Sequence, residues 1–415
     1  MPGTSPRSRL FSTSPFLAFA GFGVFWGVWG ACLPLLRAQA GVSDARFGVA
    51  LLLVGAGALP AMLLTGRLVD AAGLRVAGVL LALLGVSGVV LCAISTGYAG
   101  LCAGILAVGA ASGASDVAIN TLAATVEKRR GRPVVARSHA AFSGAVAASS
   151  LAAGALAAAT GSLLAAFTAA AVPVAAVAAT VVTATRPAAV RAADEVPCKD
   201  SGVRQDTDPD VRSDAGAGRS PGWSALAVIG GIGALAFAAE NAFQSWAAVL
   251  LTDTFAASPA VAAVAPAAFA ATAALARLAG GPVMLHRPIA ALVTSGVIAT
   301  AGGVLTATAP SLPLALVGVV AAALGTATLF PTLLSYGLRS VPDAFRGRAT
   351  SAVSTVAYLG FLAGPAYFGM LADAGGVQRA FLGVAALTGL LLATLPVLPR
   401  LGRSVKIEAP ERVPC

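Results

Sequence analysis

The stretch GRLVDAAGLR, residues 66–75, joins two long apolar segments of the chain, 46–66 and 75–95. Three of its ten side chains are charged, and each flanking segment has about the 20 residues that a helix needs to cross about 30 Å of hydrocarbon. Inside lipid, backbone N–H and C=O groups have no water to bind, so a spanning segment must satisfy them within a helix. This stretch therefore predicts two membrane-spanning helices joined by a short charged turn.

The composition of the whole chain extends this prediction. Of the 415 residues, 58% are hydrophobic and 11% are charged, whereas a soluble domain has about 25% charged residues. A soluble enzyme with a single buried core is thereby excluded. Twelve segments are long and apolar enough to be membrane-spanning helices, namely 15–36, 46–66, 75–95, 98–124, 138–159, 162–183, 223–250, 258–282, 287–308, 311–336, 349–372 and 378–398.

Several features of the sequence exclude whole classes of function. The net charge of +10 comes from basic residues scattered between apolar segments, whereas a nucleic-acid binder concentrates them on one soluble face. The five cysteines and two histidines lack metal-ligand spacing, so we expect neither a metal site nor a disulfide scaffold. The sequence contains no evident nucleophile–base pair and no G-x-x-x-x-G-K-[ST] phosphate loop. We therefore expect no enzyme activity, no ATP-driven step, no cofactor and no nucleic-acid partner.

The distribution of basic residues predicts the orientation in the membrane. Cytoplasmic loops of membrane proteins carry an excess of Lys and Arg. With the N-terminus in the cytoplasm, all but three of the 27 Lys and Arg residues fall on the cytoplasmic side, the exceptions being Arg37, Arg46 and Arg379. Both termini are therefore predicted to be cytoplasmic. The Ala-, Gly- and Arg-rich composition indicates a bacterium, so the cytoplasmic membrane is the expected location, with the lipid bilayer as a partner.

A polar segment divides the twelve helices into two groups of six. Residues 186–222 contain six Lys or Arg, seven Asp or Glu and four prolines, and such a segment buries too little apolar surface to become ordered. Two six-helix halves are typical of transporters built from parallel repeats, whose substrate site lies near the bilayer midplane between the halves. The predicted organisation is a cytoplasmic tail 1–14, a six-helix bundle 15–184, a disordered cytoplasmic linker 185–222, a six-helix bundle 223–398 and a cytoplasmic tail 399–415.

The stretch 66–75 also resembles the signature loop of the major facilitator superfamily, G-x-L-x-D-x-x-G-x-R. All five defining positions are present, as Gly66, Leu68, Asp70, Gly73 and Arg75. The resemblance implies an all-α polytopic membrane protein with the major facilitator fold. It also implies that this loop latches the cytoplasmic gate while the protein opens outward. Locally, Gly73 permits the tight turn and Asp70 can face the positive N-terminus of a nearby helix.

Further stretches are similar to the fucose-permease-like branch of that superfamily. They are residues 116–120, 126–133, 138–143 and 360–365, together with Glu240 and Trp246. The predicted helix 138–159 lacks the glycine–proline pattern typical of drug/proton antiporters, which argues against an efflux pump without excluding one. The predicted loop that includes Arg277 keeps the arginines and glycines of the signature but lacks its acid, so no second latch is expected.

Acids within predicted membrane helices are the strongest functional signal. A charged side chain at a helix centre costs at least ~2.5–3.5 kcal/mol on the insertion scale, so its presence needs a reason. Asp116 and Glu240 are such acids, one in each half. Asn120 and Gln244 lie four residues after them, so each acid shares a helix face with an amide. We expect one acid to carry a coupling proton beside an amide that recognises hydroxyl or carbonyl groups.

Asp116 and the nearby His139 each allow more than one interpretation. The resemblance implies a role for an acid in the fourth helix, which is Asp116. Asp116 is equally well interpreted as a static brace that pairs with Arg137 or His139. His139 itself is either a proton relay in the cavity or a solvated residue at a helix end.

Aromatic residues suggest a cavity wall in the first predicted helix. Phe22, Trp26 and Trp29 recur at helical spacing and form a stripe that faces either a substrate cavity or lipid and neighbouring helices. Trp246 is expected in the aromatic belt at the membrane interface.

The expected function is secondary active transport of a small organic solute by a monomer, with the proton gradient as the energy source. Uptake of a sugar-like or polar metabolite is favoured over efflux by proton antiport. The two halves and the signature loop disfavour a channel. A membrane sensor that keeps the carrier fold without transporting is the non-transport interpretation of the same sequence.

Overall fold

The computed structural model describes residues 6–132, 134–186, 222–339, 341 and 343–405 of the chain. All regular elements in these ranges are helices, which confirms the predicted fold class. The first half contains α1 (Pro6–Ala40), α2 (Asp44–Ala72), α3 (Val76–Ile94), α4 (Tyr98–Arg130), α5 (Val135–Thr160) and α6 (Leu163–Ala184). The second half contains α8 (Trp223–Phe255), α9 (Pro259–Ala262), α10 (Val264–His286), α11 (Pro288–Thr308), α12 (Leu312–Gly337), α13 (Asp343–Gly375), α14 (Val377–Thr394), the 3₁₀ helix η1 (Leu395–Val397) and α15 (Leu398–Val405).

Twelve helices among the described residues are long and apolar enough to cross a membrane, and they correspond one to one with the twelve predicted segments. The predicted helix 258–282 is interrupted at Ala263 and consists of α9 followed by α10. Two boundaries differ, because α1 begins at Pro6, within the predicted tail 1–14, and α15 occupies the start of the predicted tail 399–415. Most of the predicted linker 185–222 lies outside the described residues, as does the chain after residue 405.

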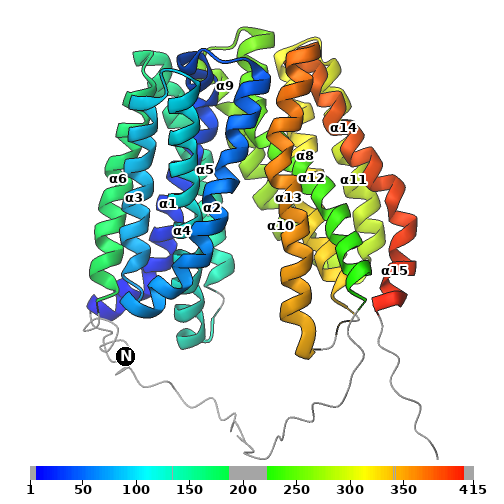
Figure 1. Cartoon of the computed structure of the whole chain (residues 1–415), viewed down its shortest axis with the longest axis horizontal. Coiled ribbons are helices and arrows are strands. Elements are labelled where there is room, and N and C mark those ends of the chain that lie inside the picture. Colours follow the sequence, from blue (N-terminus) through cyan, green and yellow to red (C-terminus); the bar gives the residue numbers. More distant parts are fainter. Residues whose placement is uncertain (1–5, 133, 187–221, 340, 342, 406–415) are drawn as a thin grey trace, which may run out of the picture.

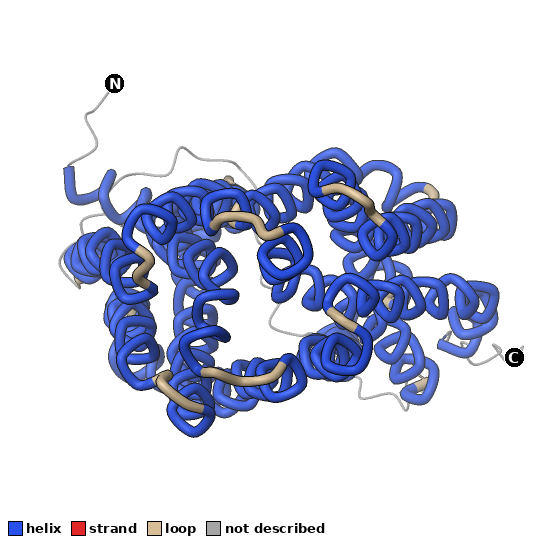
Figure 2. The backbone as a smooth tube through the Cα atoms, turned by 90° about the horizontal axis from the view of Figure 1, so that it is seen from above, coloured by secondary structure: helices blue, strands red, loops and turns tan. Residues whose placement is uncertain are grey.

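The helices form two bundles that lie side by side, α1 to α6 and α8 to α14 (Figures 1 and 2). The bundles meet at one end and separate toward the other (Figure 1). We call the first end, which carries α9 and the α1–α2 turn, the closed end. We call the second end, which carries α15 and residues 66–75, the open end.

Small residues allow the helices of each bundle to approach closely. The pair Gly109 and Gly113, whose spacing also arises by chance in a chain with 47 glycines, lies in α4 against Val54 and Ala58 of α2. A Cβ atom on Gly113 would lie 2.7 Å from the Cα of Ala58. Because lipid provides no hydrophobic force between helices, such backbone contacts are the main source of packing energy.

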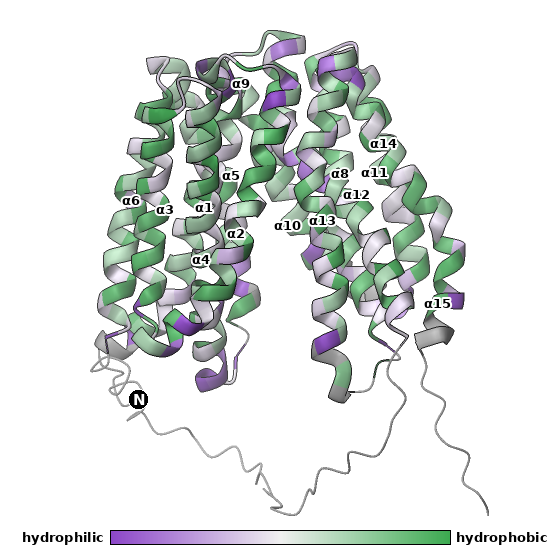
Figure 3. Cartoon of the chain, viewed as in Figure 1, coloured by the Kyte–Doolittle hydropathy of each residue, from purple (hydrophilic) through white to green (hydrophobic). Residues whose placement is uncertain are grey.

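Buried apolar residues form two clusters. The larger one runs through the first bundle and continues into α8, α10 and α13, so it joins the two bundles. The smaller one belongs to the second bundle alone and includes Leu226, Leu333 and Val353. Hydrophobic residues also cover the long sides of both bundles, as expected of surfaces that face lipid (Figure 3). The shared core therefore joins the two bundles, whose helices separate toward the open end (Figure 1).

Candidate functional site

A cavity of about 260 Å³ lies between the two bundles, and both contribute to its wall. The first bundle supplies residues of α1, α2 and α5, namely Trp26, Trp29, Gly30, Leu51, Val54, Gly55, Phe142, Ser143 and Val146. The second supplies residues of α8, α10 and α13, namely Asn241, Gln244, Ser245, Pro266, Phe269, Ala270, Ala273, Arg277, Phe361, Leu362 and Pro365. A site shared by both halves is the arrangement expected of a carrier built from two repeats.

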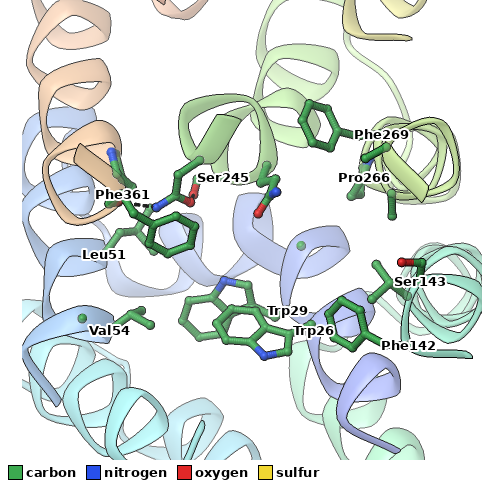
Figure 4. Close-up of a pocket in the computed structure, with 18 of the residues that line it drawn as sticks. Trp26, Trp29, Leu51, Val54, Phe142, Ser143, Ser245, Pro266, Phe269 and Phe361 are labelled. Carbon is green, nitrogen blue, oxygen red and sulfur yellow. Dashed lines mark hydrogen bonds between the residues drawn. The ribbon is translucent and has the colours of Figure 1, made fainter. Parts of the chain in front are cut away.

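Aromatic side chains dominate the wall of this cavity. Trp26 and Trp29 lie opposite Ser245 and Phe361, with Phe142 to one side (Figure 4). The ring centroids of Trp26 and Trp29 are 5.8 Å apart in an edge-to-face arrangement, and the rest of the predicted stripe packs behind them. Two of the three stripe residues thus line the cavity, whereas the sequence allowed the stripe to face either a cavity or lipid and neighbouring helices.

Glu240 and Gln244 come together with Arg277, a residue that the sequence analysis assigned to a cytoplasmic loop. Arg277 instead lies within α10, and its Nη2 is 2.7 Å from Oε1 of Glu240. Gln244 Nε2 donates to the same oxygen at 3.1 Å. Glu240 is buried, with 6% of its surface exposed, whereas Gln244 and Arg277 face the cavity. The loop interpretation of Arg277 is therefore wrong, because α10 continues past it to His286.

Two prolines supply backbone acceptors at this site. Proline has no N–H, so the carbonyl four residues earlier in the helix loses its intrahelical partner. Pro331 in α12 frees the carbonyl of Ala327, which accepts from Arg277 Nε at 3.0 Å. Pro365 in α13 frees the carbonyl of Phe361. Each freed carbonyl is thus positioned to bind a cavity side chain.

Asn241 is the side chain that binds the carbonyl of Phe361. Its Nδ2 donates at 2.5 Å, and its Oδ1 accepts from Ser245 Oγ at 3.2 Å. The sequence analysis missed Asn241 because it weighed prolines only as hinges. The available signal was a proline in a membrane helix, whose unpaired carbonyl needs a donor from another helix.

Asp116 and Asn120 lie in α4, outside the residues that line this cavity. Asn120 Nδ2 is 3.2 Å from Asp116 Oδ1, so the predicted acid–amide pair is present. Tyr358 of α13 lies within electrostatic range of both Asp116 and Glu240. No ion pair of Asp116 with Arg137 or His139 is found in the described part of the chain.

His139 is exposed near the start of α5 and packs edge-on against Phe19, with ring centroids 4.7 Å apart. It lies within electrostatic range of Arg277 but does not line the cavity. Its proposed role as a proton relay stays a prediction.

The signature loop lies at the open end. Gly73 ends α2 with φ of +77°, a conformation that favours glycine, and its N–H donates to Val69. Arg75 Nε donates to the carbonyl of Ala72, within the same turn. Leu68 and Asp70 are exposed, and a Cβ atom on Gly66 would meet nothing within 4 Å. Among the described residues, no ion pair connects this loop to the second bundle.

At the closed end, ion pairs and aromatic packing join the bundles. Arg37 of α1 pairs with Asp44 of α2, and its Nη2 is 2.5 Å from Asp253 of α8. Trp246 is fully buried between Phe47 of α2 and Phe368 of α13, with ring centroids 5.7 and 5.0 Å away. The expectation that Trp246 belongs to the membrane-interface belt is therefore wrong, because its ring fills the contact between the bundles.

Comparisons with known proteins agree with this architecture. The family model of the Major Facilitator Superfamily matches residues 228–413. An uncharacterized transporter of Sinorhizobium fredii is 39% identical over 140 residues, which cover 31% of this chain and 35% of that protein. An uncharacterized MFS-type transporter of Yersinia pestis is 36% identical over 148 residues, which cover 34% and 36%. The chain thus spans about a third of the length of the curated relatives it matches.

Solved transporters share the fold over nearly the whole chain. A bacterial homolog of the human lysosomal transporter Spinster, in an inward-facing and occupied conformation, has a TM-score of 0.68 at 16% identity, covering 98% of this chain and 100% of its own. The nucleoside transporter NupG has a TM-score of 0.69 at 14% identity, covering 95% and 100%. A D-xylose–proton symporter has a TM-score of 0.64 at 13% identity, covering 96% and 99%. These likenesses show the fold of the chain, while the fucose-permease-like branch stays a prediction.

Proposed function

We propose that this chain, a multi-pass membrane protein with the fold and signature loop of the major facilitator superfamily, is a secondary transporter that moves a small organic solute by alternating access. The observation that carries this proposal is the cavity shared by both bundles, with extensive contact between the bundles at only one end. A solute bound there exchanges with one compartment at a time. The expected setting is a monomer in the bacterial cytoplasmic membrane.

The state described here is then open to the cytoplasm. The open end carries the signature loop and the helix ends that flank the linker, all of which the basic residues assign to the cytoplasm. The Spinster homolog, with which the chain shares its fold, was solved in an inward-facing conformation, and this supports the assignment.

We infer that the proton gradient drives the cycle, through either Glu240 or Asp116. Glu240 is the stronger candidate because it is buried beside the cavity and is held by two side chains, Arg277 and Gln244, that face the cavity. Asp116 is supported by its position within electrostatic range of Tyr358, which is also in range of Glu240. No cofactor is needed for this chemistry.

The direction of transport has two candidates. Uptake of a sugar-like or other polar metabolite is favoured by the amide and hydroxyl groups of Gln244, Ser143 and Ser245 in the cavity. Export of a hydrophobic compound is favoured by the aromatic wall around Trp26 and Trp29.

Counterflow in proteoliposomes tests the function. The purified full chain is reconstituted, an inward or outward pH gradient is imposed, and labelled neutral sugars, nucleosides and small organic acids are supplied. The expected result is exchange of at least one solute class, with accumulation that depends on the direction of the gradient. Ligand binding without flux of any solute would instead favour a sensor that keeps the carrier fold.

The proton carrier is tested with Glu240→Gln and Asp116→Asn. The variant that lacks the carrier should keep counterflow and lose accumulation driven by the pH gradient. Asp373→Asn is a matched control, because Asp373 is an exposed acid of α13 outside the cavity. Full gradient-driven transport in both Glu240→Gln and Asp116→Asn would rule out this role for either acid.

A further inference from the structure

The cavity contains an unusual distribution of charge. Of the described residues that line it, Arg277 alone carries a charge. Its partner Glu240 lies behind it, since 8% of the Glu240 side chain is exposed against 45% of the Arg277 side chain. A solute in the cavity therefore meets a cation, while the compensating anion is withdrawn from contact.

Arg277 is held in a way that leaves donors unused. A guanidinium has five N–H donors in a planar fork. Nε binds the carbonyl of Ala327, which Pro331 has freed, and one N–H of Nη2 binds Glu240. The bond to the backbone fixes the position of the guanidinium independently of Glu240. Once Glu240 is displaced, the N–H groups of Nη1 and Nη2 match the two oxygens of a carboxylate.

The rest of the cavity wall limits the body of the solute. Trp26, Trp29, Phe142 and Phe269 present large apolar faces, which suit a planar or branched apolar group. The small volume excludes a large ligand, and outside Gln244, Ser143, Ser245, Asn241 and Arg277 the wall is apolar. An apolar body with one anionic group fits this wall best.

We propose, building on the transport function above, that the cavity takes a small organic monoanion with an apolar, planar body. Its carboxylate binds Arg277 in place of Glu240. Glu240 then takes one proton from the solution that fills the open end, so its carboxylate becomes a carboxylic acid. The physical reason is that one guanidinium cannot neutralise two carboxylates in a site of low dielectric. One proton is therefore taken up for each anion bound.

Two of the helices packed against α8, α10 and α13, bring charged or titratable groups to this pair. α10 brings Arg277, and α13 brings Tyr358 into electrostatic range of Glu240. Asp116 of α4 is in range of the same tyrosine, and His139 of α5 is in range of Arg277. Arg277 and Gln244 both donate a hydrogen bond to Oε1 of Glu240, and of the two only Arg277 is charged. Capture of Arg277 by another anion therefore leaves the acid without its counter-ion and open to protonation.

Binding to the purified full chain in detergent gives the first test, read from the intrinsic fluorescence of its four tryptophans, of which Trp26 and Trp29 line the cavity. The probes are benzoate, phenylacetate and 3-phenylpropanoate, each compared with its neutral amide, and 3-phenylpropylamine as the cation. At least one carboxylate should bind tenfold or more tightly than its amide, and the amine should not bind. Equal binding of acids and amides, or failure of every carboxylate to bind, would overturn the proposal.

Proton uptake in weakly buffered solution gives the second test. Wild-type protein should take up about one proton for each anion bound. Glu240→Gln should still bind the anion, at least as tightly, with no proton uptake, because Arg277 is free from the outset. Arg277→Gln should lose the preference for the acid over its amide, and Arg277→Lys should keep part of it. Should Arg277→Gln fail to fold, the Glu240→Gln result still decides, since anion binding with unchanged proton uptake contradicts the exchange.

Counterflow separates this proposal from the transport function on which it builds. Flux of neutral solutes without flux of carboxylates would overturn the anion site and leave transport intact. Carboxylate binding with proton uptake but no flux would support the anion site and contradict transport.

Discussion

The two ends of α2 meet the second bundle in opposite ways. Near its start, Gly48 lies against the backbone of α13, where a Cβ atom would come within 3.1 Å of the Cα atoms of Ala366 and Gly369. Near its finish, Gly66 has open space around it and Leu63 is 81% exposed. One end is therefore held by close backbone packing and the other is free to move in this state. We infer that α2 and α13 must separate at the closed end when the bundles come together at the open end.

The largest expected effect comes from Gly48→Leu. The added side chain cannot fit against α13, and overpacking costs about 1–3 kcal/mol, or roughly 5- to 150-fold in the population of the closed-end contact. Labelling of a reporter cysteine at Ala372 of α13, which is 3% exposed in this state, in a background without the native cysteines, should become faster by this factor. Gly389→Leu is the control, because a Cβ atom there meets nothing within 4 Å. Unchanged labelling in Gly48→Leu would show that the contact does not close this end.

The next largest effect is expected from Asn241. Its hydrogen bond to the carbonyl of Phe361 lies about one helical turn before the part of α13 that packs against Gly48. Asn241→Ala leaves a buried carbonyl without its donor, at a cost of about 1–3 kcal/mol, and should lower the unfolding midpoint of the purified protein. Pro365→Ala restores a backbone N–H to that carbonyl. The same Asn241→Ala change should therefore cost less in a Pro365→Ala background, and equal costs in both backgrounds would contradict this interpretation of the proline.

A smaller effect is expected from the ion pair between Arg37 and Asp253. Their side chains are 17% and 32% exposed, and pairs of this kind contribute up to about 1 kcal/mol. Asp253→Asn should speed labelling at Ala372 by up to about fivefold, and high salt should speed it in the chain with Asp253 intact but not in the variant. Asp253→Glu keeps the charge and serves as the control. A variant as salt-sensitive as wild type would show that this pair does not hold the closed end.

The smallest effect on the described state is expected at the open end. Asp70 is exposed, so Asp70→Asn should change the free energy of unfolding by less than about 0.5 kcal/mol. Counterflow should nevertheless slow several-fold, because the signature loop is expected to act when the open end closes. Asp70→Glu is the matched control. A marked loss of stability, or counterflow at the wild-type rate, would contradict the role of a latch.

The sequence predicted the fold well and the site only in part. Hydropathy alone located the twelve spans, because lipid allows the backbone few structures besides the helix. Glu240 was predicted as a site residue because a charged side chain in a membrane helix is costly and therefore indicates a function. Gln244 followed because a spacing of four residues places it on the same helix face. The role of Arg277 was missed because it was assigned to a cytoplasmic loop as a basic residue near the end of an apolar segment, although the predicted helix 258–282 already included it and α10 continues to His286.

Trp246 was misplaced for a related reason. Hydropathy gives the depth of a residue along a helix but not the direction in which its side chain points. The contact of Trp246 with Phe47 and Phe368 depends on how the two bundles are packed, and no local pattern in the sequence records that packing.

The pairing of one buried acid with one cavity cation has an electrical consequence. On the proposed exchange, the loaded carrier gains an anion and a proton together, so its cycle moves no net charge and should be insensitive to membrane voltage. Glu240→Gln would carry the anion alone, and its transport should then generate a current. The hydrogen bond between Arg277 and Ala327 is what keeps the cation in place while its partner changes, so a backbone carbonyl freed by Pro331 would help to make the wild-type carrier electrically silent.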